Sequence, residues 1–216
     1  LKIKDALVHH PEQIKDGEEE GMKIFSEFSG DVLVRKTSFS GKSDDLLIDR
    51  IETFKQGKPS ELIDVFDDRI EVSKEYKLLP DGTEQFANRF VFKDCELSGF
   101  AKECKLLSDG TEQLANRFVF KDGELSKFEK ECKHLPDGTE QVANRFVFED
   151  GELLAFAKEY KHLPDETEQF ANNFVFEDGE LSAFMKDNKF LPDGTEQVAN
   201  CFEFEYGELI NYEKKW

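Results

Sequence analysis

The chain has 216 residues, enough for one or two domains with a sizeable core, and its 48 acidic and 29 basic residues give a formal net charge of −19. Nucleic acids and anionic membranes are normally bound through basic surfaces, so this charge disfavours both as direct partners. We recognise no secretory signal and no apolar run of the length that spans a membrane.

Residues 1–70 follow no strict period, but they carry signals for tight turns. A Lys-Asp-Gly-Glu turn is predicted at residues 15–18, and looser turns that begin with Phe are predicted at residues 28–31, 39–42 and 54–58. The segments between them at residues 22–28 and 31–39 read as strands. We therefore interpret residues 1–70 as diverged β-hairpins that continue into residues 71–216 as one repeat domain.

Residues 44–55 allow a second interpretation. Ser43 could cap a short helix, Asp44 and Asp45 would occupy its first turn, and Gly57 would stop it. The helix and the diverged hairpin both remain open for this segment.

Residues 71–216 contain one unit of 28 residues written five times without an insertion. The unit has a Pro-Asp-Gly-Thr turn, exact at residues 80–83, 136–139 and 192–195, in which proline presets the first corner and glycine takes a left-handed conformation, so a three-residue hairpin loop is predicted. In the fourth unit Glu166 replaces this glycine, at a cost of roughly 1 kcal/mol. A second turn, Asp-Gly-Glu, is predicted to be a hairpin loop of the same kind.

The segments between these turns alternate aromatic and β-branched residues, as in Phe-Val-Phe at residues 118–120. As strands, they would place Phe100 and Cys104 on one face, and Phe90, Phe92, Phe100 and their copies would form a buried core. A helix is the rival, because Leu125, Phe128, Cys132 and Leu135 have helical spacing. Turns at both ends of every segment favour strands, so we expect an all-β antiparallel meander in an elongated or curled sheet, with little helix after residue 71.

Four cysteines, Cys95, Cys104, Cys132 and Cys201, form no disulfide framework and no metal quartet. Free thiols favour a reducing compartment, either the cytoplasm or a host cell into which the protein is delivered. His134 and His162 share a repeat column with leucine and phenylalanine, which indicates a packing or half-exposed position and disfavours a catalytic or metal-binding role. We expect no catalytic residue, metal or cofactor, because no nucleophile, base and orienting group recur together.

The unit combines Pro-Asp-Gly-Thr with Asn-x-Phe-x-Phe-Lys-Asp-Gly-Glu-Leu and a following aromatic residue. In this it resembles the MORN-type hairpin repeats, over residues 71–216. The resemblance implies an antiparallel β-sheet used for attachment to proteins or membranes, with no catalytic residues.

The position after the second Phe of each unit changes from Lys93 and Lys121 to Glu149, Glu177 and Glu205, which makes the later units more acidic. These three glutamates are our candidate binding residues. We expect a non-enzymatic protein–protein interaction module whose acidic surface binds a protein with a basic surface, as an inhibitor or nucleic-acid mimic does. The alternative is attachment of a small ligand, carbohydrate or surface along aromatic ladders, and the acidity would then serve solubility.

Overall fold

The computed structural model describes residues 13–19, 22–40 and 47–214, which form antiparallel strands and turns. They form two compact units, residues 1–97 and 98–216, each of which is described by itself. The described ranges contain no helix, and so none that could cross a membrane. The all-β antiparallel prediction is confirmed.

In the first unit each strand from β1 to β5 pairs antiparallel with the next, and β6 pairs with both β5 and β8. The short β7 also pairs with β8. Ile24, Phe39, Ile48 and Leu62 provide the most buried apolar side chains of β2 to β5. The strands are β1 (Gln13–Glu19), β2 (Met22–Ser29), β3 (Val32–Ser40), β4 (Leu47–Lys55), β5 (Lys58–Val65), β6 (Ile70–Lys74), β7 (Lys77–Leu78) and β8 (Glu84–Lys93).

The structure tests most of the turns and the helix predicted for residues 1–70. The turns predicted at 28–31 and 54–58 are confirmed, with Gly30 and Gly57 in the left-handed conformation at φ 61° and 72°. The turn predicted at 15–18 is wrong, because Gly17 lies within β1 and pairs with Ile24 of β2. The helix is also wrong over residues 47–55, which form β4, while residues 41–46 lie outside the described part of the chain.

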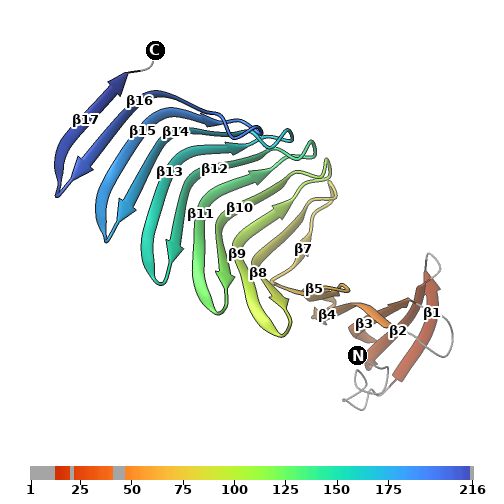
Figure 1. The fold of residues 1–216 in the computed structure, drawn as a ribbon. Helices are drawn as coiled ribbons and strands as arrows, with labels where there is room; N and C mark the ends of the chain where they lie inside the picture. Colours follow the sequence, from red (N-terminus) through yellow and green to blue (C-terminus); the bar gives the residue numbers. More distant parts are fainter. Residues whose placement is uncertain (1–12, 20–21, 41–46, 215–216) are drawn as a thin grey trace. The chain divides into compact units, whose positions relative to one another are not determined.

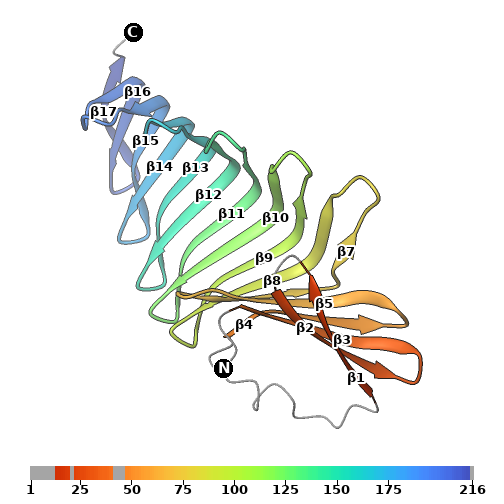
Figure 2. The same ribbon diagram turned by 90° about the vertical axis from the view of Figure 1, so that its right-hand side faces the viewer.

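In the second unit every strand from β9 to β17 pairs antiparallel with the next along the chain. Figures 1 and 2 show these strands side by side in chain order. The strands are β9 (Glu96–Leu106), β10 (Glu112–Lys121), β11 (Glu124–His134), β12 (Glu140–Glu149), β13 (Glu152–His162), β14 (Glu168–Glu177), β15 (Glu180–Phe190), β16 (Glu196–Glu205) and β17 (Glu208–Lys214).

The Pro-Asp-Gly loops have the predicted geometry. Between β11 and β12, the Gly138 N–H donates to the Leu135 carbonyl at 3.0 Å, and the Leu135 N–H donates to the Thr139 carbonyl at 2.9 Å. The Asp137 carboxylate accepts the Thr139 N–H at 2.8 Å, and this bond and the Thr139 hydroxyl lower the pKa of Asp137. Glu166 adopts the same left-handed conformation as the glycine that it replaces, with φ 65°.

The Asp-Gly turns differ from the prediction, because they are two-residue turns. Asp122 and Gly123 are both left-handed, with φ 52° and 81°, and Lys121 pairs directly with Glu124. The extra residue expected in the loop lies instead in a bulge of β11 at Ser126, whose hydroxyl donates to the Val119 carbonyl at 3.2 Å. The bulge is therefore displaced from the turn into the strand.

A left-handed acidic residue also interrupts the strands that follow these turns. Glu103, Glu131, Glu159 and Asp187 have φ of 51°, 54°, 51° and 51°. Beyond this residue the alternation of side chains restarts with the opposite parity. Phe100 and Cys104 therefore lie on opposite faces, and the prediction of a single aromatic face is wrong.

The face on which Cys104 lies, here called the inner face, carries the most buried row of the second unit. Cys104, Leu114, Cys132, Val142 and Tyr160 follow one another across β9 to β13, with exposed fractions of 2–4%. Val198 of β16 continues the row at 3%. The core therefore consists mainly of small and aliphatic residues, and the prediction of a phenylalanine core is wrong.

The phenylalanines instead stack into a ladder on the other face. Their ring centroids are 4.6–5.6 Å apart, with interplanar angles of 18–30°. All are half-buried except Tyr212, which is exposed. The phenylalanine ladder consists of Phe100, Phe118, Phe128, Phe146, Phe156, Phe174, Phe184, Phe202 and Tyr212.

Candidate functional site

The three predicted binding residues lie at equivalent places on consecutive hairpins of the second unit. Glu149, Glu177 and Glu205 are the last residues of β12, β14 and β16, and all three are exposed. Each pairs across a two-residue turn with another exposed glutamate, Glu152, Glu180 or Glu208. Figure 1 shows these turns at one end of the strands, opposite the Pro-Asp-Gly loops, so the fold gathers the candidate residues along one edge.

We call this edge the acidic turn row; it comprises residues 121–124, 149–152, 177–180 and 205–208. A hollow of about 500 Å³ separates the first two turns. Half-buried Leu125, Phe148 and Leu154 line it together with exposed Glu124 and Glu149. A hollow of about 370 Å³ lies at the equivalent place between the last two turns, lined by Leu181, Phe204 and acidic residues. Each combines apolar side chains with carboxylates, which suits the aliphatic stem and charged end of a lysine or arginine.

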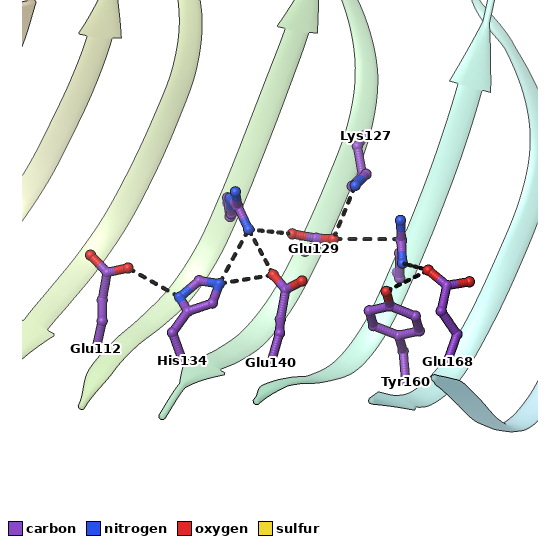
Figure 3. Close-up of polar contacts among 9 residues, drawn as sticks. Glu112, Lys127, Glu129, His134, Glu140, Tyr160 and Glu168 are labelled. Atoms are coloured by element: carbon purple, nitrogen blue, oxygen red, sulfur yellow. Dashed lines mark hydrogen bonds and ion pairs between the residues drawn. The ribbon is translucent and has the colours of Figure 1, made fainter. Parts of the chain in front are cut away.

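A second concentration of charge lies on the inner face, across β10 to β14, and was not predicted. Its centre is Glu129, a fully buried carboxylate between two arginines of neighbouring strands. Arg117 Nη1 lies 3.4 Å from Glu129 Oε2, and Arg145 Nε lies 3.6 Å from Glu129 Oε1. Lys127 Nζ approaches the same oxygen at 3.9 Å (Figure 3). Three cations therefore surround one carboxylate.

The β10 side of this cluster continues through a histidine. His134 Nδ1–H donates to Glu112 at 3.0 Å, and Nε2–H donates to Glu140 at 2.8 Å (Figure 3). Arg117 Nη1 also donates to Glu140, at 2.7 Å. The hydrogen bonds to Glu112 and Glu140 raise the pKa of His134 to about 9, while that of Glu140 falls to about 2, chiefly through its bond with His134. The imidazole is therefore a cation at neutral pH. His134 is half-exposed, as predicted for its column, but its ion pairs were not predicted.

The β13 side of the cluster is organised around Arg145. Its guanidinium lies 4.1 Å from the centroid of the Tyr160 ring, and its Nη1 lies 3.9 Å from Glu168. The Tyr160 hydroxyl donates to the same Glu168 oxygen at 2.9 Å (Figure 3). Burial raises the pKa of Tyr160 above its ordinary value, so the phenol stays protonated and remains a donor.

This inner-face cluster has the features of a structural ion-pair network. Its carboxylates lie against cations, and its neighbour Cys132 is buried with a pKa raised to about 12, so that thiol is a poor nucleophile. Among the described residues no group of His, Cys, Asp and Glu has a metal-binding arrangement. The cluster can fix the register of β10 to β14, because its ion pairs, apart from Lys127–Glu129 within β11, join side chains of different strands.

One signal in the sequence could have revealed the cluster. Glu129 occupies a repeat column that otherwise holds Ala101, Ala157, Met185 and Glu213, and it faces arginines in both neighbouring strands. An acid in a column that is otherwise mostly apolar, flanked by two basic positions of the adjacent column, predicts a buried ion pair once the strand register is known.

Comparison with known proteins adds no family assignment. No protein-family model matches the chain, and no curated protein matches its sequence.

Proposed function

We propose that the protein is a non-enzymatic interaction module that binds a protein with a basic surface through the acidic turn row. The observation that carries this proposal is the alignment of Glu149, Glu177 and Glu205 along one edge, each exposed and each opposite a further exposed glutamate. A recurring hairpin array that presents a regular surface is also consistent with a MORN-type organisation, which we retain as part of the proposal.

Exposure separates these carboxylates from those of the inner face. Exposed charges of one sign attract an oppositely charged partner over about one Debye length, roughly 8 Å at physiological ionic strength. Repetition every 28 residues lets a partner engage several turns at once, which multiplies weak single contacts. The hollows between the turns give lysine and arginine side chains apolar surface to cover as well as carboxylates to pair with.

The alternative, attachment of a carbohydrate along an aromatic ladder, has less support. Rings that bind sugars offer their faces, whereas the phenylalanine ladder stacks ring against ring at 4.6–5.6 Å. The neighbouring rings therefore occupy the surfaces that a sugar would need.

Titration calorimetry with cytochrome c, a small folded protein of net positive charge, tests the proposal. The turn variant carries Glu149→Lys, Glu177→Lys and Glu205→Lys, and a matched control carries Glu103→Lys, Glu131→Lys and Glu159→Lys, three exposed positions in β9, β11 and β13 with the same total charge change. We expect the turn variant to lose at least about tenfold more affinity than the control. Equal losses in both variants would show that only net charge matters and would refute the turn row as the binding surface.

A further inference from the structure

The last turn of the acidic turn row differs from the others by one aromatic residue. Tyr206 occupies the column in which the earlier turns have Asp94, Asp122, Asp150 and Asp178. Its backbone is left-handed, with φ 50°, a conformation that aspartate adopts more readily than tyrosine. Its side chain is 87% exposed. Backbone preference therefore does not explain the tyrosine, and its ring is accessible to a partner.

Tyr206 lines the hollow of about 370 Å³ between the last two turns. One side of this hollow is the turn between β14 and β15, and the other is the turn between β16 and β17. Half-buried Leu181 and Phe204 add apolar surface next to the tyrosine. The lining residues belong to two neighbouring hairpins, so the hollow does not involve the outer edge of β17.

The charged residues that line this hollow are all acidic. They are exposed, and they are Glu177, Asp178, Glu180 and Glu205. In the equivalent hollow between the turns at residues 121–124 and 149–152, Lys121 stands in the place of Glu177, and Asp150 stands in the place of Tyr206. The last hollow therefore differs from the first by an added aromatic ring and by the absence of a basic residue among the described residues that line it. Both differences favour a positively charged occupant.

Elsewhere in the chain, arginines already combine the same two kinds of neighbour. The Arg145 guanidinium lies 4.1 Å from the centroid of the Tyr160 ring, and its Nη1 lies 3.9 Å from Glu168. In the first unit the Arg69 guanidinium lies 4.0 Å from the centroid of the Phe66 ring and also pairs with neighbouring carboxylates. The lysines that approach phenylalanine rings lie 5.5–5.8 Å from the centroids. A planar guanidinium can stack on a ring while its N–H groups bind carboxylates, so arginine suits such a site better than lysine.

We propose that the hollow between the last two turns binds an arginine side chain of the partner protein, with the guanidinium against the Tyr206 ring and its N–H groups on the surrounding carboxylates. This inference rests on the proposed function, because it names the side chain that anchors the basic partner at the acidic turn row. Leu181 and Phe204 cover the aliphatic stem of the arginine. The last turn then fixes the position of the partner, and the other turns add electrostatic attraction.

Fluorescence anisotropy with labelled hexa-arginine and hexa-lysine peptides, which carry the same side-chain charge, tests the inference on the full chain. We expect the unchanged chain to bind hexa-arginine at least about threefold more tightly than hexa-lysine. Tyr206→Asp removes the ring and introduces the residue of the other turns. It should weaken hexa-arginine binding about threefold and leave hexa-lysine binding as tight or tighter, because it adds a negative charge. Tyr206→Phe keeps a ring and should keep the preference for arginine.

The outcomes separate this inference from the proposed function. If Tyr206→Asp binds hexa-arginine as tightly as the unchanged chain or more tightly, charge alone attracts the peptide, and the arginine site is refuted while the acidic turn row stands. Equal binding of the two peptides by the unchanged chain would also refute the arginine site. If the turn variant and its matched control bind hexa-arginine equally well, or if the unchanged chain does not bind it, the acidic turn row itself is refuted.

Discussion

The inner face and the acidic turn row of the second unit both concentrate charge, but they use it differently. On the inner face Glu129 is fully buried and lies within 4 Å of Arg117, Arg145 and Lys127. In the turn row Glu149, Glu177 and Glu205 are exposed and lie opposite other glutamates. Charge on the inner face is therefore balanced within the fold, whereas charge at the turns is available to a partner.

The largest expected effect comes from removing the buried acid. Glu129→Ala leaves three cations without their shared carboxylate, and we expect it to lower the free energy of unfolding by about 3 kcal/mol. The equivalent change on the exposed strand β17, Glu213→Ala, is the control and should cost less than about 0.5 kcal/mol. Urea denaturation of both variants measures the difference. Equal losses of stability in Glu129→Ala and Glu213→Ala would mean that burial does not distinguish the two acids, and would contradict the contrast between balanced and available charge.

A smaller effect should appear as a pH dependence of the same cluster. The pKa of His134 is raised from 6.5 to about 9, so its stabilising contribution is complete below about pH 6.5 and is lost as the pH rises through about 9. The variant His134→Leu, which places the leucine of other units at this position, removes that contribution. We expect the unchanged chain to exceed the variant by about 1–2 kcal/mol at pH 6, and by much less at pH 10.

The pKa of Glu140 provides the complementary test at low pH. Because it is lowered from 4.5 to about 2, the stability that Glu140 contributes is present above about pH 4.5 and is lost as the pH falls through about 2. For His134, the contradicting result is a difference in free energy of unfolding between the unchanged chain and His134→Leu that stays constant from pH 6 to pH 10.

At the Pro-Asp-Gly loops, the backbone conformation of a residue should affect the free energy of unfolding, and the charge of its side chain should not. Glu166 is exposed and left-handed, with φ 65°, where Gly138 and Gly194 occupy the equivalent position. We expect Glu166→Gly to raise the free energy of unfolding by about 1 kcal/mol, because glycine adopts this conformation without strain. Glu166→Gln keeps the strain and removes the charge, so its stability should be unchanged within about 0.3 kcal/mol. A gain in Glu166→Gln equal to that in Glu166→Gly would assign the effect to charge instead.

The smallest effect on stability is expected from the acidic turn row itself. Glu149→Lys, Glu177→Lys and Glu205→Lys change exposed residues whose cross-turn neighbours are also glutamates. Each change replaces a repulsion by an attraction, and we expect a combined gain of no more than about 1 kcal/mol. Thermal unfolding followed by circular dichroism measures it. A loss of several kcal/mol would show that these glutamates belong to the fold, as Glu129 does.

The sequence predicted the features that depend on local chemistry. Proline, aspartate and glycine at fixed spacing set the loop whose Gly138 is left-handed, and the strands that follow have the predicted order. The exposed edge of Glu149, Glu177 and Glu205 follows from the same turns. The predictions of which face a side chain lies on failed where one residue changed the alternation of side chains, at Glu131 and at the bulge at Ser126. No local pattern in the sequence marks a left-handed glutamate within a strand. Without the correct parity the inner row and the pairing of Glu129 with two arginines could not be found.

The association rate with cytochrome c at two ionic strengths, measured by stopped flow, tests the central claim most directly. Our account predicts that raising salt from about 20 to 300 mM slows association of the unchanged chain by about tenfold or more, because exposed carboxylates steer the partner. The variant with Glu149, Glu177 and Glu205 changed to lysine should lose most of this salt dependence. The control with Glu103, Glu131 and Glu159 changed to lysine should keep most of it. If both variants lost the same share, or neither did, the acidic turn row would not be the surface that recognises a basic partner.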